Sequence, residues 1–176
     1  MSEYQITCCS TADMPAQYFE EKKIPFVCFN FLMDGVQYPD DLGKSMPFKE
    51  FYKKIADGAE PTTAQVNTQQ YMELFEPILQ KGLDILHLTL SSGISGSINS
   101  ANIAKVQMEE KYPGRKVRII DSLSASSGYG MLVDMALTKQ QEGLSLEENA
   151  SWLEENRNKL HHWFFSTDLT SFIRGG

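Results

Sequence analysis

The sequence predicts an α/β protein with three layers, α/β/α, in which helices cover both faces of a mostly parallel sheet. Short β-rich or apolar runs alternate along the chain with longer helical patterns, and this alternation is typical of parallel sheets. Residues 83–90 are too few and too apolar for a surface helix and suit a strand that is buried on both faces. The 176 residues, of which 41% are hydrophobic, are enough for one core.

The first predicted unit is a strand at residues 4–9, followed by a turn and a helix that begins near Pro15. Residues 24–32 are β-rich, and Asp34 and Gly35 predict a hairpin turn before a short strand at 36–38. We expect these strands to lie against the core. The same is expected of the aromatic side chains in both regions, which are Phe26, Phe29, Phe31, Phe48, Phe51 and Tyr52.

Helices and strands continue to alternate through the rest of the chain. Ser45 and Pro47 predict the start of a helix that stops at Gly58, and Ser145 with Glu148 forms a capping box for a helix that reaches Lys159. The other predicted elements are a loop at 60–66, a helix at 67–82, the strand at 83–90, a helix at 94–112, a strand at 117–120, a helix ending at 141 and a strand at 161–167.

Composition argues against several classes of partner. The formal net charge of -7 opposes electrostatic binding of nucleic acid or of an anionic membrane surface. No stretch approaches the roughly 18 apolar residues of a membrane-spanning helix, and the N-terminal residues do not resemble a signal peptide, so we expect a cytoplasmic protein without a membrane span. Cys8 and Cys9 are neighbours on a predicted strand, and no two histidines have ligand spacing, so no metal site is predicted.

Hydroxyl-bearing residues and glycines follow three predicted strands, at residues 9–11, 91–97 and 121–124, and a fourth polar loop at 61–65 precedes a helix. The carboxyl ends of parallel strands meet at one edge of a sheet, where helix N-termini present unpaired N–H groups. These loops therefore suit a carboxylate or a phosphate. Helix capping explains any single loop better, but their number favours a ligand site.

Familiar catalytic motifs are missing. The Gly-Ile-Ser-Gly-Ser segment at 93–97 lacks the final glycine of a nucleophile elbow, there is no P-loop, and Gly-Tyr-Gly at 128–130 lacks the third glycine of a dinucleotide fingerprint. Asp13, Asp121 and Asp168 are the available acid–base candidates, and each is better explained as a cap or turn residue. We therefore predict a binding protein and not an enzyme.

The polar motifs occur together in an order that resembles the DegV family of fatty-acid-binding proteins. They are Ser-Thr-Ala-Asp at 10–13, Pro-Thr-Thr-Ala-Gln at 61–65, Leu-Ser-Ser-Gly-Ile-Ser-Gly-Ser at 90–97 and Asp-Ser at 121–122. The resemblance spans essentially the whole chain. It implies two α/β lobes that enclose one fatty acid, which some family members present to a separate kinase.

By this resemblance the chain binds a long-chain fatty acid and carries it for lipid metabolism, with the lipid as its ligand and no cofactor. The resemblance assigns the carboxylate to the hydroxyls of Thr62 and Ser92, with Thr63 and Ser91 beside them and a backbone amide from Gly93. It also implies a fatty acid kinase as partner. Polar support behind the site is expected from Ser10, Asp121 and Ser122.

The resemblance also divides the chain. Residues 1–160 correspond to the N-terminal lobe, and 161–176 to the start of a connection toward a second lobe, truncated at Arg174-Gly175-Gly176. Family members usually carry Asp where this chain has Cys9, so one polar contact behind the site is expected to be lost.

Two other functions remain open. Dihydroxyacetone-kinase-like proteins resemble the same fold, and in that reading the hydroxyl-rich loops hold a phosphorylated small molecule during phosphoryl transfer. Alternatively the chain is an interaction domain, and the lobe is expected to self-associate through an apolar face.

Overall fold

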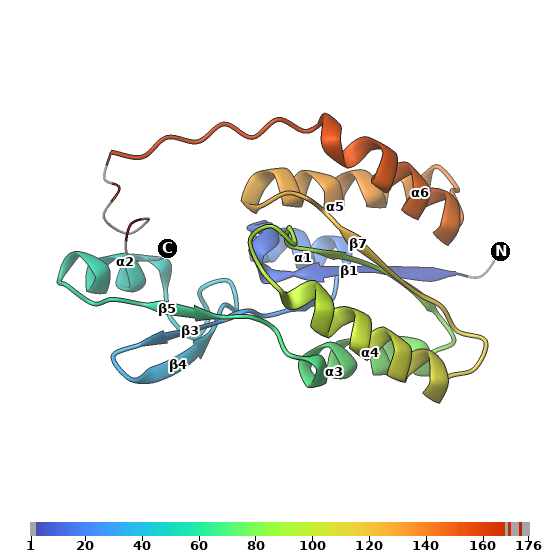
Figure 1. The fold of residues 1–176 in the computed structure, drawn as a ribbon, viewed down its shortest axis with the longest axis horizontal. Helices are drawn as coiled ribbons and strands as arrows, with labels where there is room; N and C mark the ends of the chain where they lie inside the picture. Colours follow the sequence, from blue (N-terminus) through green and yellow to red (C-terminus); the bar gives the residue numbers. More distant parts are fainter. Residues whose placement is uncertain (1–2, 168, 170–172, 174–176) are drawn as a thin grey trace.

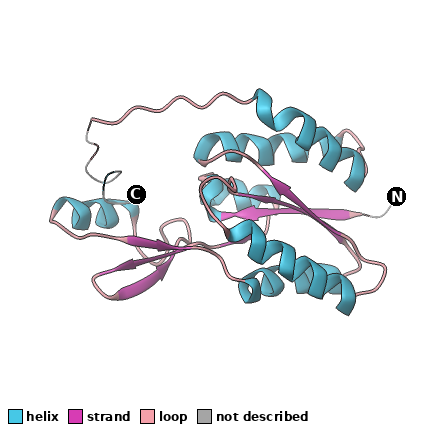
Figure 2. Ribbon diagram, in the orientation of Figure 1, coloured by secondary structure: helices cyan, strands magenta, loops and turns pink. Residues whose placement is uncertain are grey.

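The computed structural model describes residues 3–167, 169 and 173, and its centre is a parallel sheet with the strand order β2-β1-β6-β7 (Figure 1). Two helices cover one face of this sheet and two cover the other (Figure 2). The α/β/α prediction is therefore confirmed. The strands are β1 (Tyr4–Cys9), β2 (Phe26–Val27), β6 (Asp84–Thr89) and β7 (Val117–Asp121), and the helices are α3 (Thr68–Gln80) and α4 (Ser97–Lys111) on one face and α5 (Ser126–Gln141) and α6 (Leu146–Asn156) on the other.

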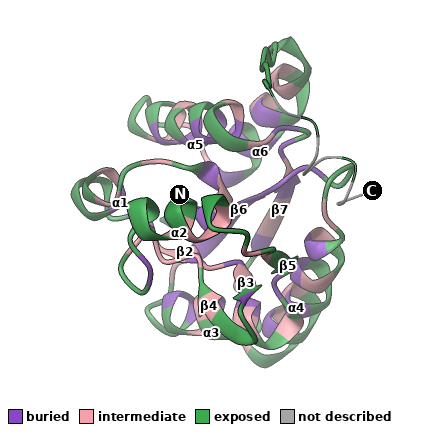
Figure 3. Ribbon diagram, turned by 90° about the vertical axis from the view of Figure 1, so that its left-hand side faces the viewer, coloured by how far each residue is buried: buried purple, intermediate pink, exposed green. Residues whose placement is uncertain are grey.

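The core lies between the sheet and these helices, where Figure 3 shows the buried residues. Every residue of β6 is buried, as the apolar character of residues 83–90 predicts for a strand covered on both faces. Phe75 of α3 and Leu132 of α5 are among the largest fully buried side chains. Both predicted thiols of β1, Cys8 and Cys9, are buried and unpaired.

The predicted helix boundaries hold best where a cap is present. Ser145 and Glu148 form the expected capping box at the start of α6, and 3-10 helix η2 (Arg157–Lys159) follows it. The helix expected to start near Ser45 begins later, as α2 (Phe48–Ala56), because Ser45 bonds with Asp41 instead of capping it. The first strand leads through 3-10 helix η1 (Ser10–Ala12) into α1 (Ala16–Lys22).

A second sheet stands apart from the core together with α2 (Figure 1). It is antiparallel, with the order β4-β3-β5, and consists of β3 (Asn30–Met33), β4 (Val36–Pro39) and β5 (Thr62–Ala64). The hairpin turn at Asp34-Gly35 is confirmed. The expectation that this hairpin lies against the core is largely wrong, because Leu32 and Val36 are 46% and 50% exposed. The predicted loop at 60–66 contains β5, because its backbone pairs with β3.

The strand predicted at residues 161–167 is wrong. Residues 161–166 have no regular secondary structure, and Trp163, Phe164 and Phe165 are 93%, 83% and 92% exposed. Their apolar pattern resembles that of a strand, but no sheet edge pairs with them. Asp168 and Arg174-Gly175-Gly176 lie outside the described residues. Within the described part of the chain, no helix combines the length and apolar character needed to cross a bilayer.

Candidate functional site

The carboxyl edge of the central sheet opens between β1 and β6. Pairing of these strands ends at Thr7 and His87, and the side chain of Tyr129 then bridges them. Its hydroxyl donates to the carbonyl of Leu88 (2.5 Å) and accepts from the N–H of Cys9 (2.9 Å). The chain continues from β1 to β2 on one side, whereas β6 lies on the other, so this is the switch point at which open α/β sheets collect ligands.

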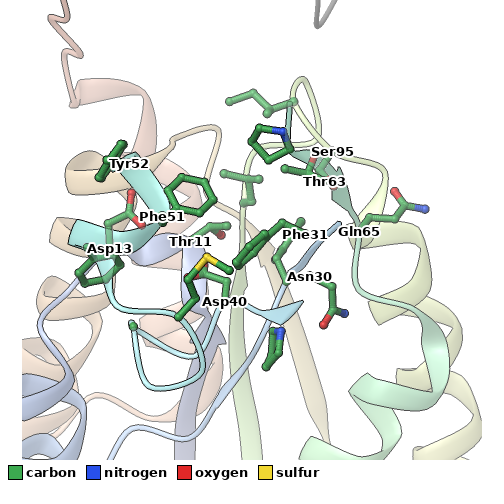
Figure 4. A pocket seen from close by; sticks show the side chains of 18 of the residues that line it. Thr11, Asp13, Asn30, Phe31, Asp40, Phe51, Tyr52, Thr63, Gln65 and Ser95 are labelled. Atoms are coloured by element: carbon green, nitrogen blue, oxygen red, sulfur yellow. The ribbon is translucent and has the colours of Figure 1, made fainter. Parts of the chain in front are cut away.

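A cavity of about 690 Å³ lies beyond this edge, between the strand-end loops, the second sheet and α2 (Figure 4). Its volume falls within the roughly 300–1,000 Å³ that is typical of small-molecule sites. The lining residues are Thr11, Asp13, Phe29, Asn30, Phe31, Pro39, Asp40, Gly43, Met46, Phe48, Phe51, Tyr52, Pro61, Thr63, Gln65, Leu90, Ile94, Ser95 and Gly96.

One end of the cavity presents hydrogen-bond donors. Thr63, Ser95 and Gln65 line the cavity and lie on the same side of it in Figure 4. A Cβ atom on Gly96 would lie only 3.0 Å from the amide oxygen of Gln65, so the glycine allows the two segments to approach. Gly96 is also the N-cap of α4, whose first turn carries partial positive charge. This end of the cavity therefore suits an anion.

The loop before α4 holds Ser95 in place through its own polar groups. The carbonyl of Ser91 accepts from the N–H of Ser95 (3.0 Å), and the Ser91 hydroxyl accepts from the N–H of Gly93 (3.2 Å). Asp121 accepts from the N–H of Ser92 (3.1 Å). The Ser95 hydroxyl accepts from the N–H of Ser97 (3.2 Å), which leaves its own hydrogen to donate to a ligand.

The two threonines of the Pro-Thr-Thr motif have different environments because they lie on a strand. Thr63 pairs with Phe31, and both residues line the cavity. Thr62 pairs with Leu32, and neither lines it. Since successive side chains on a strand point to opposite faces, the structure brings Thr63 to the cavity and turns Thr62 away from it.

The remaining predicted residues surround the cavity without lining it. Ser92 is exposed and Ser91 is nearly buried, while Gly93 lies beside them in the loop. Ser122 is buried and exchanges hydrogen bonds with Ser124. Sequence reasoning missed Ser95, although it belongs to the same loop motif. The period of two in a strand would have pointed to Thr63, had residues 62–64 been recognised as a strand.

Two carboxylates, Asp40 and Asp13, also line the cavity, and Asp13 lies on the side away from Thr63 and Ser95 in Figure 4. The N–H of Asp40 donates to the carbonyl of Phe29 (2.8 Å), and Ser10 accepts from the N–H of Phe29 (3.1 Å). Burial raises the pKa of Asp40, and a hydrogen bond with Ser10 opposes that shift. The described contacts of Ser10 are thus with Asp40 and the backbone of Phe29.

Aromatic side chains form the wall between the two ends. Phe31 and Phe51 meet edge to face with ring centroids 5.1 Å apart. Phe48 and Tyr52 are 59% and 66% exposed, so the expectation that they belong to the core is wrong. They occupy one face of α2 and give the cavity an apolar wall that solvent still reaches.

A separate polar cluster is buried behind the site. Thr7 Oγ1 lies 2.8 Å from His87 Nδ1, and Cys9 Sγ lies 3.8 Å from His87 Nε2. Burial lowers the pKa of His87 to about 3 and raises the pKa of the Cys9 thiol. The imidazole is therefore neutral and the thiol protonated at neutral pH. Among the described residues, no group of His, Cys, Asp and Glu side chains could hold a metal ion.

Comparison with known proteins assigns a family. The sequence profile of the DegV family, described as uncharacterised proteins, matches residues 4–176. A DegV domain-containing protein of Clostridium perfringens is 36% identical over 176 residues, which are 100% of this chain and 60% of that protein. The chain therefore spans about three fifths of the length of this relative.

Solved structures agree with that assignment. A stearic-acid-binding protein from Eubacterium ventriosum superposes with a TM-score of 0.79 and 28% identity, over 86% of this chain and 52% of that one. A DegV family protein from Thermus thermophilus, described for its fatty acid binding, superposes with a TM-score of 0.74 and 28% identity, over 90% of this chain and 54% of that one. By its sequence and its fold, this chain belongs to the DegV family.

Proposed function

We propose that this chain binds a long-chain fatty acid, with the carboxylate at the donor end of the cavity and the acyl chain along the aromatic wall. The single observation that carries the proposal is the meeting of Thr63, Ser95 and the N-terminus of α4 in one apolar-walled cavity. Related proteins of similar fold are described as binding stearic acid or fatty acids. The family resemblance had assigned the carboxylate to Thr62 and Ser92. The cavity geometry favours Thr63 and Ser95 instead.

The two parts of the cavity contribute differently to the free energy of binding. A buried methylene contributes about 0.8 kcal/mol, so a fully enclosed acyl chain would contribute on the order of 10 kcal/mol. Hydrogen bonds to a charged group contribute about 1.5–3 kcal/mol each and mainly offset the desolvation of the carboxylate. Because Phe48 and Tyr52 remain exposed, this chain encloses the acyl tail only in part, and we expect weak binding.

We propose that the protein is a carrier for the bound fatty acid and not an enzyme. The thiol of Cys9 and the imidazole of His87 are fully buried and do not line the cavity. A carrier in lipid metabolism can hand its acid to a kinase that phosphorylates the carboxylate, and we propose such a fatty acid kinase as partner. We further propose that the protein works in the cytoplasm with no cofactor besides the lipid.

The experiment uses the opposite orientations of neighbouring residues. Thr63→Val and Thr62→Val remove the same hydroxyl from opposite faces of β5, and Ser95→Ala and Ser92→Ala remove a hydroxyl inside and outside the cavity. Native mass spectrometry of the purified chain incubated with palmitate measures the bound fraction. We expect the affinity of the Thr63 and Ser95 variants for palmitate to fall about tenfold per lost hydrogen bond, which corresponds to 1.4 kcal/mol. The Thr62 and Ser92 variants should retain the wild-type affinity.

Equal occupancy in all four variants would contradict this placement of the carboxylate. The alternative function, phosphoryl transfer on a small molecule as in dihydroxyacetone-kinase-like proteins, also uses an anion at the donor end. It predicts that a small phosphate ester such as glycerol 3-phosphate, and not palmitate, binds in the same assay.

A further inference from the structure

The cavity is electrostatically asymmetric. Its donor end has Thr63, Ser95 and the N-terminus of α4, whereas Asp13 lies on the other side in Figure 4, beyond Phe51. Asp40 lines the cavity as well, and no Lys or Arg is among its described lining residues. A ligand inside the cavity therefore meets partial positive charge at one place and carboxylates at another.

The position of Asp40 is fixed by the surrounding backbone. Its N–H donates to the carbonyl of Phe29, and its carboxylate is held by Ser10, which also accepts from the N–H of Phe29. Neighbouring Asp41 differs, because both of its carboxylate oxygens accept from the N–H of Ser45, outside the cavity (2.9 and 3.0 Å). Asp40 is thus a partly buried acid that lines the cavity together with Asp13.

The surroundings of Asp40 determine which ligand groups it tolerates. A methyl end or a neutral hydroxyl can lie near the carboxylate, and a hydroxyl can donate to it. A second carboxylate near Asp40 would meet a like charge on a side chain that is itself partly buried. Repulsion of this kind weakens binding by on the order of 10–100-fold.

We propose that Asp40, assisted by Asp13, is the specificity-determining residue of the cavity: it fixes the direction of the bound acyl chain and excludes acids that are anionic at both ends. The ligand class that follows is the monocarboxylic fatty acid with a neutral far end, including one that carries a terminal hydroxyl. This inference rests on the proposed fatty-acid binding.

The test compares three C16 acids that differ at one end. Palmitate, 16-hydroxypalmitate and hexadecanedioate compete with a fluorescent fatty acid for the purified chain. We expect the wild type to bind the first two within about threefold of each other and the diacid at least about tenfold more weakly, as like-charge repulsion requires. In Asp40→Asn the ratio of diacid to palmitate affinity should rise at least about fivefold. Asp34→Asn, which removes the same charge from the exposed β3–β4 turn, should leave that ratio unchanged.

The outcomes separate the two proposals. If palmitate binds and the wild type accepts the diacid equally well, or if Asp40→Asn leaves the ratio unchanged, fatty-acid binding stands and the role of Asp40 is refuted. If palmitate does not bind the wild type, both proposals fail. Should Asp40→Asn not fold, Asp13→Asn provides the second charge-removing variant, and an unchanged ratio in it overturns the inference.

Discussion

Acid should destabilise this protein through His87, and replacing that residue should remove much of the effect. His87 is fully buried in the central strand, where burial lowers its pKa from 6.5 to about 3. The folded state therefore binds fewer protons than the unfolded state between these values, and stability falls as the pH falls. At about 1.4 kcal/mol per pH unit, the full loss is about 5 kcal/mol and the loss between pH 7 and pH 5 is about 2 kcal/mol.

The assay is urea denaturation, followed by far-UV circular dichroism, at several pH values between 7 and 5. The quantity of interest is the difference in slope between the wild type and His87→Gln, because the other titrating groups contribute similarly to both. We expect the variant to be less stable at pH 7 but to lose about 2 kcal/mol less on acidification to pH 5. His161→Gln is the matched control, since His161 is exposed. Parallel stability curves for the wild type and His87→Gln would refute a neutral, buried imidazole.

Three further predictions concern packing and association. Gly130→Ala should destabilise the fold by about 1–3 kcal/mol, because its Cβ would lie 2.6 Å from a backbone oxygen of η1. Gly93→Ala, with ordinary contacts only, should be nearly neutral by thermal denaturation, and an equal cost at both sites would contradict the packing argument. Tyr129→Phe should cost about 1–3 kcal/mol in chemical denaturation, because the N–H of Cys9 and the carbonyl of Leu88 lose their partner; an unchanged midpoint would count against that bridge. The exposed aromatics at 163–165 should make the chain self-associate in sedimentation velocity, whereas a monomer at high concentration would oppose this.

Much of the central fold could be predicted because its signals are local and strong. The short, largely apolar run at residues 83–90 and the capping box at Ser145 each identify an element without knowledge of its neighbours. The second sheet is harder to predict, because the three residues of β5 become a strand only through pairing with β3. The paired residues are far apart in the chain, as the register of Thr63 with Phe31 shows. Residues 161–167 show the converse, since their strand-like pattern does not form a strand of either sheet.

The sequence indicates the edge of the sheet at which the cavity lies, but not which residues line the cavity. Hydroxyl-rich loops at strand ends indicate this edge, because parallel strands direct their exits to one side. The choice of Thr63 over Thr62 depends on β5 pairing, and the choice of Ser95 over Ser92 depends on the hydrogen bonds that fold its loop. Asp40 gives no motif signal, because its place in the cavity wall follows from the fold and not from any local pattern.

Under the proposed function, the pairing of β5 with β3 makes the length of the preceding segment a determinant of ligand chemistry. If one residue were deleted before β5 and the strand kept its hydrogen-bonding partners, every side chain would shift by one place along the ladder. Ala64 would then line the cavity in place of Thr63, and neither threonine would occupy that position. If Thr63 binds the carboxylate as proposed, relatives with insertions or deletions between α2 and β5 should differ in head-group preference.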